Sequence, residues 1–318
     1  MSQLDYRKGS HDLGQGCHAW LQPDGSWGWS NTGLITGSGT SLLVDTLFDL
    51  KLTAEMLAGL APITDHFPIA TLVNTHSDGD HFFGNELVAA RGVEIIASAA
   101  AAELMTQESV DRLRLAMGLG GVVGEFARTI FGPFTFDGIT ATGPDRTFSG
   151  ELSLDVGGRE VRLIQVGPAH TPGDTLVGVP DARLLYAGDI LFVGGTPIVW
   201  AGPIERWITA CELILDMDVT AIVPGHGPVT DKSGVHGVRD YLLFVAAESR
   251  KRFEDGLSVD EAIASIDLGK YAALPEHGRL AQNVRIVYQA LDPSLPAANV
   301  LDVFARMAEL EGFALPVD

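Results

Sequence analysis

The stretch Asn74-Thr-His-Ser-Asp-Gly-Asp-His-Phe-Phe-Gly-Asn85 concentrates metal-type side chains. It follows the short apolar run 69–73, which predicts a buried strand, and it leads into 82–91, which has the pattern of a helix. On a regular helix its acidic and imidazole side chains would diverge, so they converge only on a looped backbone, which a glycine favours. The candidate ligands in this stretch are His76, Asp78, Asp80 and His81.

These residue types point to a transition metal. Imidazole nitrogens and carboxylate oxygens are ligands of zinc, manganese and iron, and a cation offsets the repulsion between neighbouring carboxylates. The alternative interpretation is a solvated turn in which Asp78 and Asp80 cap the next helix, since aspartate is common there. Residues elsewhere in the chain favour the metal.

Three more candidate ligands occur at the ends of predicted strands. Any one of them alone would be an ordinary loop residue, but loops at one edge of a layered α/β core are where sites are built. Four strand ends that all offer such side chains predict a single site at one edge. The three residues are His170 after 161–166, Asp189 after 184–187, and His226 after 220–223.

The remaining pattern predicts an α/β layer structure followed by helices. Hydrophobic periodicity predicts a helix ending at Pro62, a helical insert over 98–131 that is suited to a lid, and a helix over 203–217. Strands cease after about residue 234. We therefore predict a catalytic domain over 1–233 and a helical extension over 234–318, which acts as a cap or as a dimerisation element. Further predicted strands are 33–36, 41–44, 93–97 and 151–156, and the predicted C-terminal helices are 235–256, 258–267, 277–291 and 297–311.

Taken together, these motifs resemble the metallo-β-lactamase superfamily. The family pattern is His-x-His-x-Asp-His, followed along the chain by a His, an Asp or Cys, and a last His. Here the order is the same over roughly residues 15–230, in the contexts AHTPGD, YAGD and PGHGP. The resemblance implies a four-layer αββα sandwich with the site at one edge.

The resemblance also implies a division of the ligands. One metal would be held by His76, Asp78 and His170, and a second by Asp80, His81 and His226, with Asp189 bridging them. Asp78 stands where the family usually has its second histidine, and this anion lowers the Lewis acidity of its metal. We expect one or two divalent ions, zinc first and manganese or iron as alternatives. A single firm ion at Asp80, His81 and His226 with a weak neighbour is the other arrangement.

This metal chemistry predicts a hydrolase. The ions would activate a water molecule against a carbonyl, and Asp80 would orient that water or carry its proton. Asp189 in place of Cys resembles the glyoxalase II and lactonase branches, so we expect an ester, thioester or lactone of an apolar small molecule as substrate. Alternatives are a polyketide cyclase or thioesterase that uses the metal as a Lewis acid, and a metal-poor binding protein without catalysis.

Aromatic residues supply a candidate substrate wall: Trp27, Trp29, Phe82 and Trp200. Core packing is the alternative for Phe82, because aromatic side chains dominate buried area. Asp45, after the run 41–44, either orients a ligand or ends its strand.

Composition narrows the partners and the compartment. The formal net charge of −20 would repel phosphate backbones and anionic lipid surfaces, so neither nucleic acid nor membrane is an expected partner. Two cysteines cannot form a disulfide framework, and the chain shows no apolar leader or spanning run. We expect a cytoplasmic protein with a small-molecule substrate, and a homodimer is a further expectation.

Overall fold

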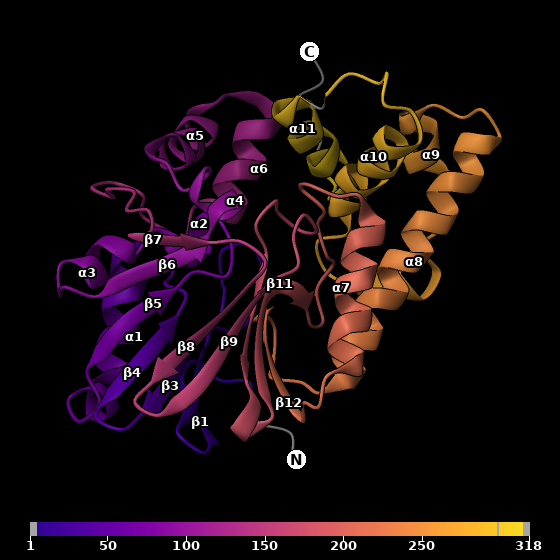
Figure 1. Cartoon of the computed structure of the whole chain (residues 1–318). Helices are drawn as coiled ribbons and strands as arrows, with labels where there is room; N and C mark the ends of the chain where they lie inside the picture. The colour runs from indigo at the N-terminus through magenta and orange to yellow at the C-terminus, as the bar shows by residue number, and fades with distance from the viewer. Residues whose placement is uncertain (1–4, 298, 314–318) are drawn as a thin grey trace.

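Two β-sheets lie at the centre of the computed structural model, which describes residues 5–297 and 299–313 (Figure 1). The first sheet has the spatial order β1 (Gly9–Gly14), β2 (Cys17–Leu21), β3 (Thr32–Gly37), β4 (Thr40–Val44), β5 (Ile69–Val73), β6 (Glu94–Ser98) and β7 (Arg146–Phe148). The second has the order β12 (Ala221–His226), β11 (Leu184–Phe192), β10 (Thr175–Val179), β9 (Arg159–Gln165) and β8 (Glu151–Val156).

Strand direction brings the site-bearing ends together. β4, β5, β6 and β7 pair in parallel, so their carboxyl ends share one edge. In the second sheet β11 and β12 are parallel, and β9 runs the same way because both β9 and β11 are antiparallel to β10. The segments that follow β5, β9 and β12 therefore leave each sheet at one edge.

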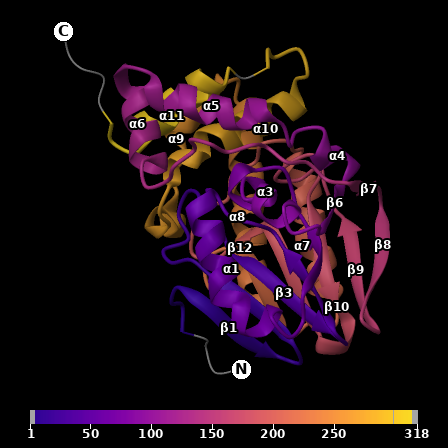
Figure 2. The same cartoon turned by 90° about the vertical axis from the view of Figure 1, so that its left-hand side faces the viewer.

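The layers follow the predicted αββα order. Helices α1 (Leu50–Thr64) and α3 (Asn85–Ala89) lie outside the first sheet, and α7 (Ile204–Asp216) and α8 (Lys232–Glu254) lie outside the second (Figures 1 and 2). An apolar layer fills the space between the sheets, because alternate side chains of each strand face the other sheet. It includes Ile35, Leu42, Val73, Val161, Leu163 and Val177.

The remaining helices gather at the edge where the site-bearing ends lie. The insert forms α4 (Ala99–Ala102), α5 (Gln107–Gly118) and α6 (Gly121–Phe131), and the C-terminal segment adds α9 (Val259–Ser265), α10 (Leu280–Leu291) and α11 (Val300–Leu310). α11 packs on α6, with the rings of Phe126 and Phe304 at 6.1 Å (Figure 1). No helix in the described part of the chain combines the length and apolarity that crossing a membrane requires. Short 3-10 turns occupy Pro180–Ala182, Gly269–Ala273 and His277–Arg279.

Several predicted elements differ from the observed ones. The expected helix over 82–91 is two short helices, α2 (Gly79–Phe82) and α3, which are separated at Phe83 and Gly84. Gly84 lies so close to Thr53 that a Cβ there would collide with its side chain. α1 continues to Thr64 rather than ending at Pro62, although Pro62 has no N–H to donate within the helix. β1, β2, β7 and β10 were not predicted; β10 lies directly after the His170 loop.

The C-terminal helices share the core of the sheets. One continuous apolar cluster contains Leu191 of β11, Trp207 of α7, Val245 of α8 and Val284 of α10. The division at residues 233 and 234 falls two residues inside α8, which begins at Lys232. The two-domain division stays a prediction.

Candidate metal centre

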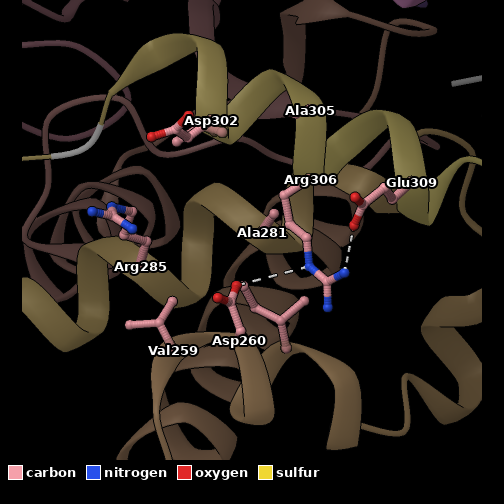
Figure 3. A pocket seen from close by; sticks show the side chains of 10 residues that line it. Val259, Asp260, Ala281, Arg285, Asp302, Ala305, Arg306 and Glu309 are labelled. Carbon is pink, nitrogen blue, oxygen red and sulfur yellow. Dashed lines mark hydrogen bonds and ion pairs between the residues drawn. The ribbon is translucent and has the colours of Figure 1, made fainter. Parts of the chain in front are cut away.

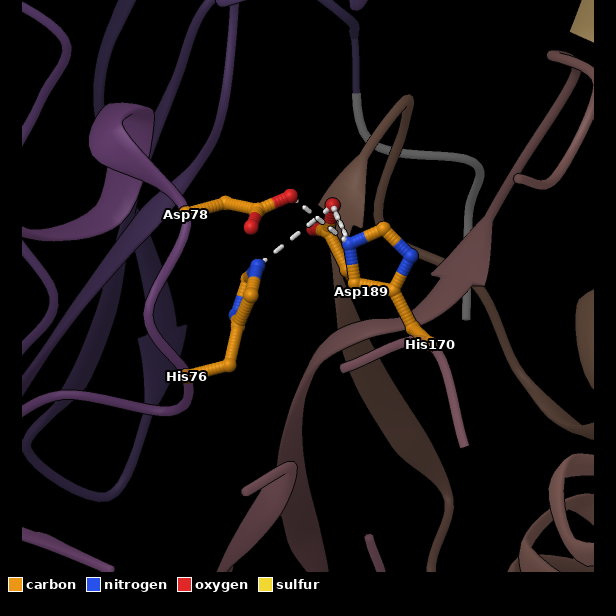
Figure 4. A group of neighbouring side chains, drawn as sticks. All are labelled: His76, Asp78, His170 and Asp189. Carbon is orange, nitrogen blue, oxygen red and sulfur yellow. Dashed lines mark hydrogen bonds and ion pairs between the residues drawn. The ribbon is translucent and has the colours of Figure 1, made fainter. Parts of the chain in front are cut away.

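Both halves of the chain deliver side chains to one place. His76 and Asp78 lie on the loop after β5, and α2 carries Asp80 and His81. From the second sheet, His170 follows β9, Asp189 lies inside β11 and His226 ends β12. The seven predicted ligands form two groups: the first group is His76, Asp78, His170 and Asp189, and the second group is Asp80, His81 and His226 (Figure 4 draws the first).

The side chains of the first group face one another (Figure 4). His170 Nε2 lies 3.1 Å from Asp78 Oδ2 and 3.3 Å from Asp189 Oδ2. His76 Nε2 lies 3.7 Å from the same Asp189 oxygen. Two imidazoles and two carboxylates therefore surround one point.

Asp189 also touches the second group. His81 Nε2 lies 3.0 Å from its Oδ1, and His226 Nε2 lies 3.4 Å from its Oδ2. Asp80 Oδ2 completes the group, at 3.2 Å from His226 Nε2 and 3.8 Å from His81 Nε2. A carboxylate between two such groups has the geometry that bridging requires.

Each histidine is oriented through its other ring nitrogen. His170 Nδ1 lies 2.6 Å from the carbonyl of Ile198, and His226 Nδ1 lies 3.1 Å from the carbonyl of Gly25. Because a carbonyl only accepts hydrogen bonds, both Nδ1 atoms carry a proton, and in the neutral imidazole both Nε2 atoms are then free to act as ligands. This arrangement fits metal binding.

Asp45 organises the other two histidines. Its Oδ2 accepts from His81 Nδ1 at 3.0 Å and from Thr75 Oγ1 at 2.7 Å. Since the Thr75 hydroxyl donates to Asp45, it accepts from His76 Nδ1, which lies 3.0 Å away. Asp45 has φ 62° in the left-handed region, and such strain is found mainly at functional positions. It both follows the end of β4 and orients ligands, so the two alternatives for this residue coincide.

Unpaired atoms mark the centre as a place for cations. His76 Nε2, His81 Nε2 and Asp189 Oδ1 are buried and make no hydrogen bond of good geometry with the described residues, although His81 Nε2 and Asp189 Oδ1 lie 3.0 Å apart as an ion pair. Buried polar atoms are rarely left so, because the desolvation cost is not repaid. Imidazole nitrogens and carboxylate oxygens are also the donors that zinc, manganese and iron accept. The residues present therefore fit divalent metal ions.

Charge interactions perturb the pKa values of the group members. Burial opposes the charged form of His170, but Asp78 and Asp189 outweigh it and raise its pKa to about 9. Burial is likewise overcome at His226, where Asp189 and Asp80 raise the pKa to about 9. The carboxylates also hold the pKa of His81 well above its usual range against burial. Protons thus supply the positive charge that a divalent cation would replace.

His76 and Asp189 shift the other way. Burial, joined by the charge of His81, places the pKa of His76 well below its usual range. Burial would raise the pKa of Asp189, but the surrounding imidazoles, first His226, hold it well below its usual range. Asp189 is therefore an anion, as a bridging ligand must be.

A glycine makes room for Asp189. A Cβ at Gly225, in β12, would collide with Asp189 Oδ1. Gly225, which directly precedes His226, therefore has to be a glycine for Asp189 to take its place in the centre.

The helix-capping alternative does not fit. Asp78 occupies the N-cap position of α2, yet its side chain makes no capping hydrogen bond. Its carboxylate reaches His170 instead, and 34% of the side chain remains exposed. Asp80 lies inside the helix rather than before it. Asp78 is thus the exposed member of an otherwise buried first group.

Of the four aromatic residues predicted to bind substrate, three are partly exposed to solvent. Trp27, Trp29 and Trp200 are partly exposed, and the rings of Trp27 and Trp200 lie 6.5 Å apart. The backbone N–H of Trp200 donates to the backbone carbonyl of His170 at 2.8 Å, which places Trp200 beside the first group. Phe82 is a correction: it is 0% exposed and packs in the core against Phe83, with ring centroids 5.0 Å apart.

Sequence reasoning missed the groups that orient the ligands. Two of them are the backbone carbonyls of Gly25 and Ile198, and a carbonyl leaves no signal in a sequence. Thr75 is different, because its place beside His76 in the motif made it detectable. A hollow of about 570 Å³ between α9, α10 and α11 was also not predicted, and none of its lining residues is a candidate ligand (Figure 3).

Comparison with known proteins identifies relatives. The model of the metallo-beta-lactamase superfamily matches residues 25–226. The chain is 28% identical over 214 residues to the 2,4-dinitroanisole O-demethylase subunit alpha of Nocardioides sp. (strain JS1661), a match covering 65% of this chain and 54% of that protein. It is 33% identical over 102 residues to the hydroxyacylglutathione hydrolase of Rhizobium meliloti (strain 1021), covering 32% and 39%. The chain thus spans about half or less of these relatives.

Solved structures share the fold. The sec-alkylsulfatase Pisa1 from Pseudomonas sp. superimposes with TM-score 0.69 at 18% identity, over 96% of this chain and 55% of that one. A metallo-beta-lactamase from Pontibacter korlensis gives TM-score 0.57 at 19% identity, over 74% of this chain and 99% of that one.

Proposed function

Because the chain belongs to the metallo-beta-lactamase superfamily, we propose that it is a metal-dependent hydrolase of an ester, thioester or lactone bond in an apolar small molecule. The observation that carries the proposal is the convergence of four imidazole Nε2 atoms and three carboxylates, with His76 Nε2, His81 Nε2 and Asp189 Oδ1 left without hydrogen bonds. Such a donor set has no purpose in a scaffold, where unpaired buried atoms only cost stability.

Two divalent ions fit the proposal, with zinc expected and manganese or iron as alternatives. Bound in such a site, a divalent ion makes water a stronger nucleophile near neutral pH and stabilises negative charge on a carbonyl oxygen. The chain's own residues do the rest. Asp189 holds the two groups at a fixed separation, and the partners of the Nδ1 atoms hold each imidazole in one orientation.

Asp80 is the proposed catalytic residue. Its carboxylate is 12% exposed and lies 3.2 Å from His226, so it reaches both the second group and incoming solvent. We assign it the task of orienting the attacking water and accepting its proton. Asp78, whose side chain is 34% exposed, marks the side from which substrate arrives.

The substrate class rests on the surroundings of the first group. Trp200 and Trp27 provide apolar, partly exposed rings beside it. The relative named hydroxyacylglutathione hydrolase supports a thioester or ester. A second candidate is an activated aryl methyl ether, because a relative whose match covers 65% of this chain is named 2,4-dinitroanisole O-demethylase subunit alpha and the tryptophans suit an aromatic ring.

Two further alternatives stay open to experiment. A cyclase that uses the metal as a Lewis acid would close a ring without incorporating solvent oxygen, so product formed in ¹⁸O-labelled water separates it from a hydrolase. A metal-poor binding protein would carry less than about one equivalent of metal when purified without chelators.

The direct test is a panel of thioesters, lactones, aryl esters and 2,4-dinitroanisole, assayed with zinc, manganese and iron. We expect turnover of at least one class, and its loss in Asp80→Ala with metal content retained in the first group. Asp137→Ala is the matched control, since that side chain is 94% exposed. Absence of turnover with all three metals, or unchanged activity in Asp80→Ala, would contradict the proposal.

The remaining proposals concern partners and place. We propose a small-molecule substrate, no nucleic-acid partner and a cytoplasmic location, which the net charge of −20 and the two unpaired, buried cysteines support. Homodimer formation is proposed as well and is checked by mass measurement in solution.

A further inference from the structure

We propose that the C-terminal segment 275–283 is a working part of the metal centre, because it positions His170 and His226. It acts through two loops whose backbone carbonyls orient these histidines. The proposal rests on the proposed function only in taking the two histidines to be metal ligands. The positioning residues are Glu276, Arg279, Gln282 and Asn283.

The first contact holds the loop that orients His170. On α10, the Asn283 side-chain Oδ1 accepts from the N–H of Val199 at 2.8 Å, and its Nδ2 donates to the carbonyl of Pro197 at 2.8 Å. These two bonds bracket Ile198, whose carbonyl lies 2.6 Å from His170 Nδ1. The position of that carbonyl is therefore set from the C-terminal helix.

Burial makes this first contact strong. Asn283 is 0% exposed, and the neighbouring Gln282, at 5%, donates to the carbonyl of Val199 at 3.0 Å. Removing the amide of Asn283 would leave the N–H of Val199 buried without an acceptor. The loop would then shift to satisfy it.

The second contact holds the loop that orients His226. Glu276 Oε1 accepts from the N–H of Trp27 at 2.8 Å, and Glu276 Oε2 pairs with Arg279 Nη1 at 3.0 Å. The Arg279 guanidinium lies over the Trp27 ring at 4.1 Å. Two residues earlier, the carbonyl of Gly25 lies 3.1 Å from His226 Nδ1. The ion pair thus clamps the same short loop that holds this imidazole.

Arg279 links the two contacts. It is 2% exposed, and its Nη1 donates to the carbonyl of Thr196 at 2.7 Å, on the loop that leads to Ile198. Its guanidinium also lies 5.3 Å from the Phe192 ring, which stacks on His226 at 5.0 Å. A buried charge with one ion-pair partner and two aromatic faces has a single favourable position.

These contacts give the extension a defined task. Outer partners that orient a ligand typically contribute 10–100-fold to metal affinity, and residues that hold those partners are expected to contribute about tenfold. The extension, predicted as a cap or a dimerisation element, would then hold in place the two loops that orient His170 and His226. Neither a pure cap nor a pure dimerisation element would change metal affinity.

Metal titration tests the proposal without any substrate, so its outcome does not depend on the reaction. Zn²⁺ affinity is measured by chelator competition for the wild type, Asn283→Ala and Arg279→Lys. The matched control is Arg285→Lys, the same substitution on α10 at a side chain that lines the hollow between α9 and α11 (Figure 3). Repeating the titrations in His170→Ala and His226→Ala backgrounds assigns each affinity to its group.

We expect Asn283→Ala to weaken Zn²⁺ binding about tenfold at the first group. Arg279→Lys should weaken it about tenfold at the second group and less at the first, which Arg279 reaches only through Thr196. Arg285→Lys should change neither. Wild-type affinity in both test variants would overturn the proposal. A lower melting temperature with unchanged affinity would overturn it too, since it would indicate a structural role alone. If either variant fails to fold, Glu276→Gln takes its place, because glutamine keeps the side-chain size and an acceptor for the Trp27 N–H. Its Zn²⁺ affinity at the second group is then measured, with the same loss of about tenfold expected and wild-type affinity overturning the proposal.

Discussion

The first and second groups share Asp189 but differ in access to solvent. In the first group the Asp78 side chain is 34% exposed, whereas in the second His81 is 0% exposed and Asp80 12%. With Asp189 counted in both, each group carries two carboxylates and two imidazoles, so access to solvent rather than composition separates them. A solvent-facing site suits substrate entry, and a buried one suits firm retention of an ion.

The groups differ again in how their histidines are held. His81 donates to the carboxylate of Asp45, which makes its Nε2 a stronger ligand, while His170 donates to a neutral carbonyl. We therefore expect the second group to bind its ion more tightly. If this difference in affinity is large, only the second group holds an ion firmly, which is the single-ion arrangement that the sequence left open.

Removing Asp189 should have the largest effect, because both groups depend on it. We expect Asp189→Ala to lower kcat by about 10³-fold or more and to reduce bound metal below one equivalent. Metal analysis and steady-state kinetics measure this. Two retained equivalents would show that Asp189 bridges nothing.

The pH dependence of metal affinity should separate the groups. The second group contains two histidines with raised pKa values, His81 and His226, and the first contains one, His170, beside His76 with a lowered pKa. Metal binds only neutral imidazole, so affinity rises with pH until the histidine pKa of about 9 is passed.

From these values, binding at pH 7 should release about two protons at the second group and about one at the first. Affinity should then rise about a hundredfold per pH unit at the second group and about tenfold at the first. Calorimetry in buffers of different ionisation enthalpy counts the protons. Equal proton release at both groups would contradict the assignment.

Asp45→Asn should weaken the second group more than the first. The amide keeps the size of the side chain, and Asn tolerates the left-handed backbone at φ 62°. The substitution removes the negative charge of Asp45 and one of the two acceptor oxygens that face Thr75 and His81. We expect a 10–100-fold loss of affinity at the second group. Chelator competition measures it, and a larger loss at the first group would argue against the role given to Asp45.

Asp78→His should have the smallest effect. The substitution restores the histidine usual in the family and replaces a hard anion with a softer neutral ligand, so the preference of the first group for zinc over manganese should rise about tenfold. The second group should keep its preference. Competition between the two metals measures this, and an unchanged preference at the first group would mean that Asp78 is not a ligand.

Local pattern predicted which seven side chains come together, because their signals are local. His76, Asp78, Asp80 and His81 share one loop and helix, and the other three stand at or near strand ends, so spacing and topology sufficed. Asp189 differs slightly: it lies within β11 rather than after it, where Gly188 at φ 50° disturbs the strand.

The features that the sequence did not predict depend on contacts between residues far apart in the chain, which no local pattern encodes. The burial of Phe82 follows from packing on Phe83, and the links from α10 to the loop at Ile198 join residues more than 80 positions apart. The short β7 has three residues and too little periodicity to be recognised. Tertiary packing, not local propensity, set these features.

A crystal structure of the protein grown with Zn²⁺, with anomalous scattering recorded on both sides of the zinc edge, bears most directly on the metal centre. We expect one peak among His76, Asp78 and His170 and another among Asp80, His81 and His226, with Asp189 in contact with both. The absence of a peak at both groups, or zinc bound only elsewhere, would contradict a metal centre built from the two halves of the chain.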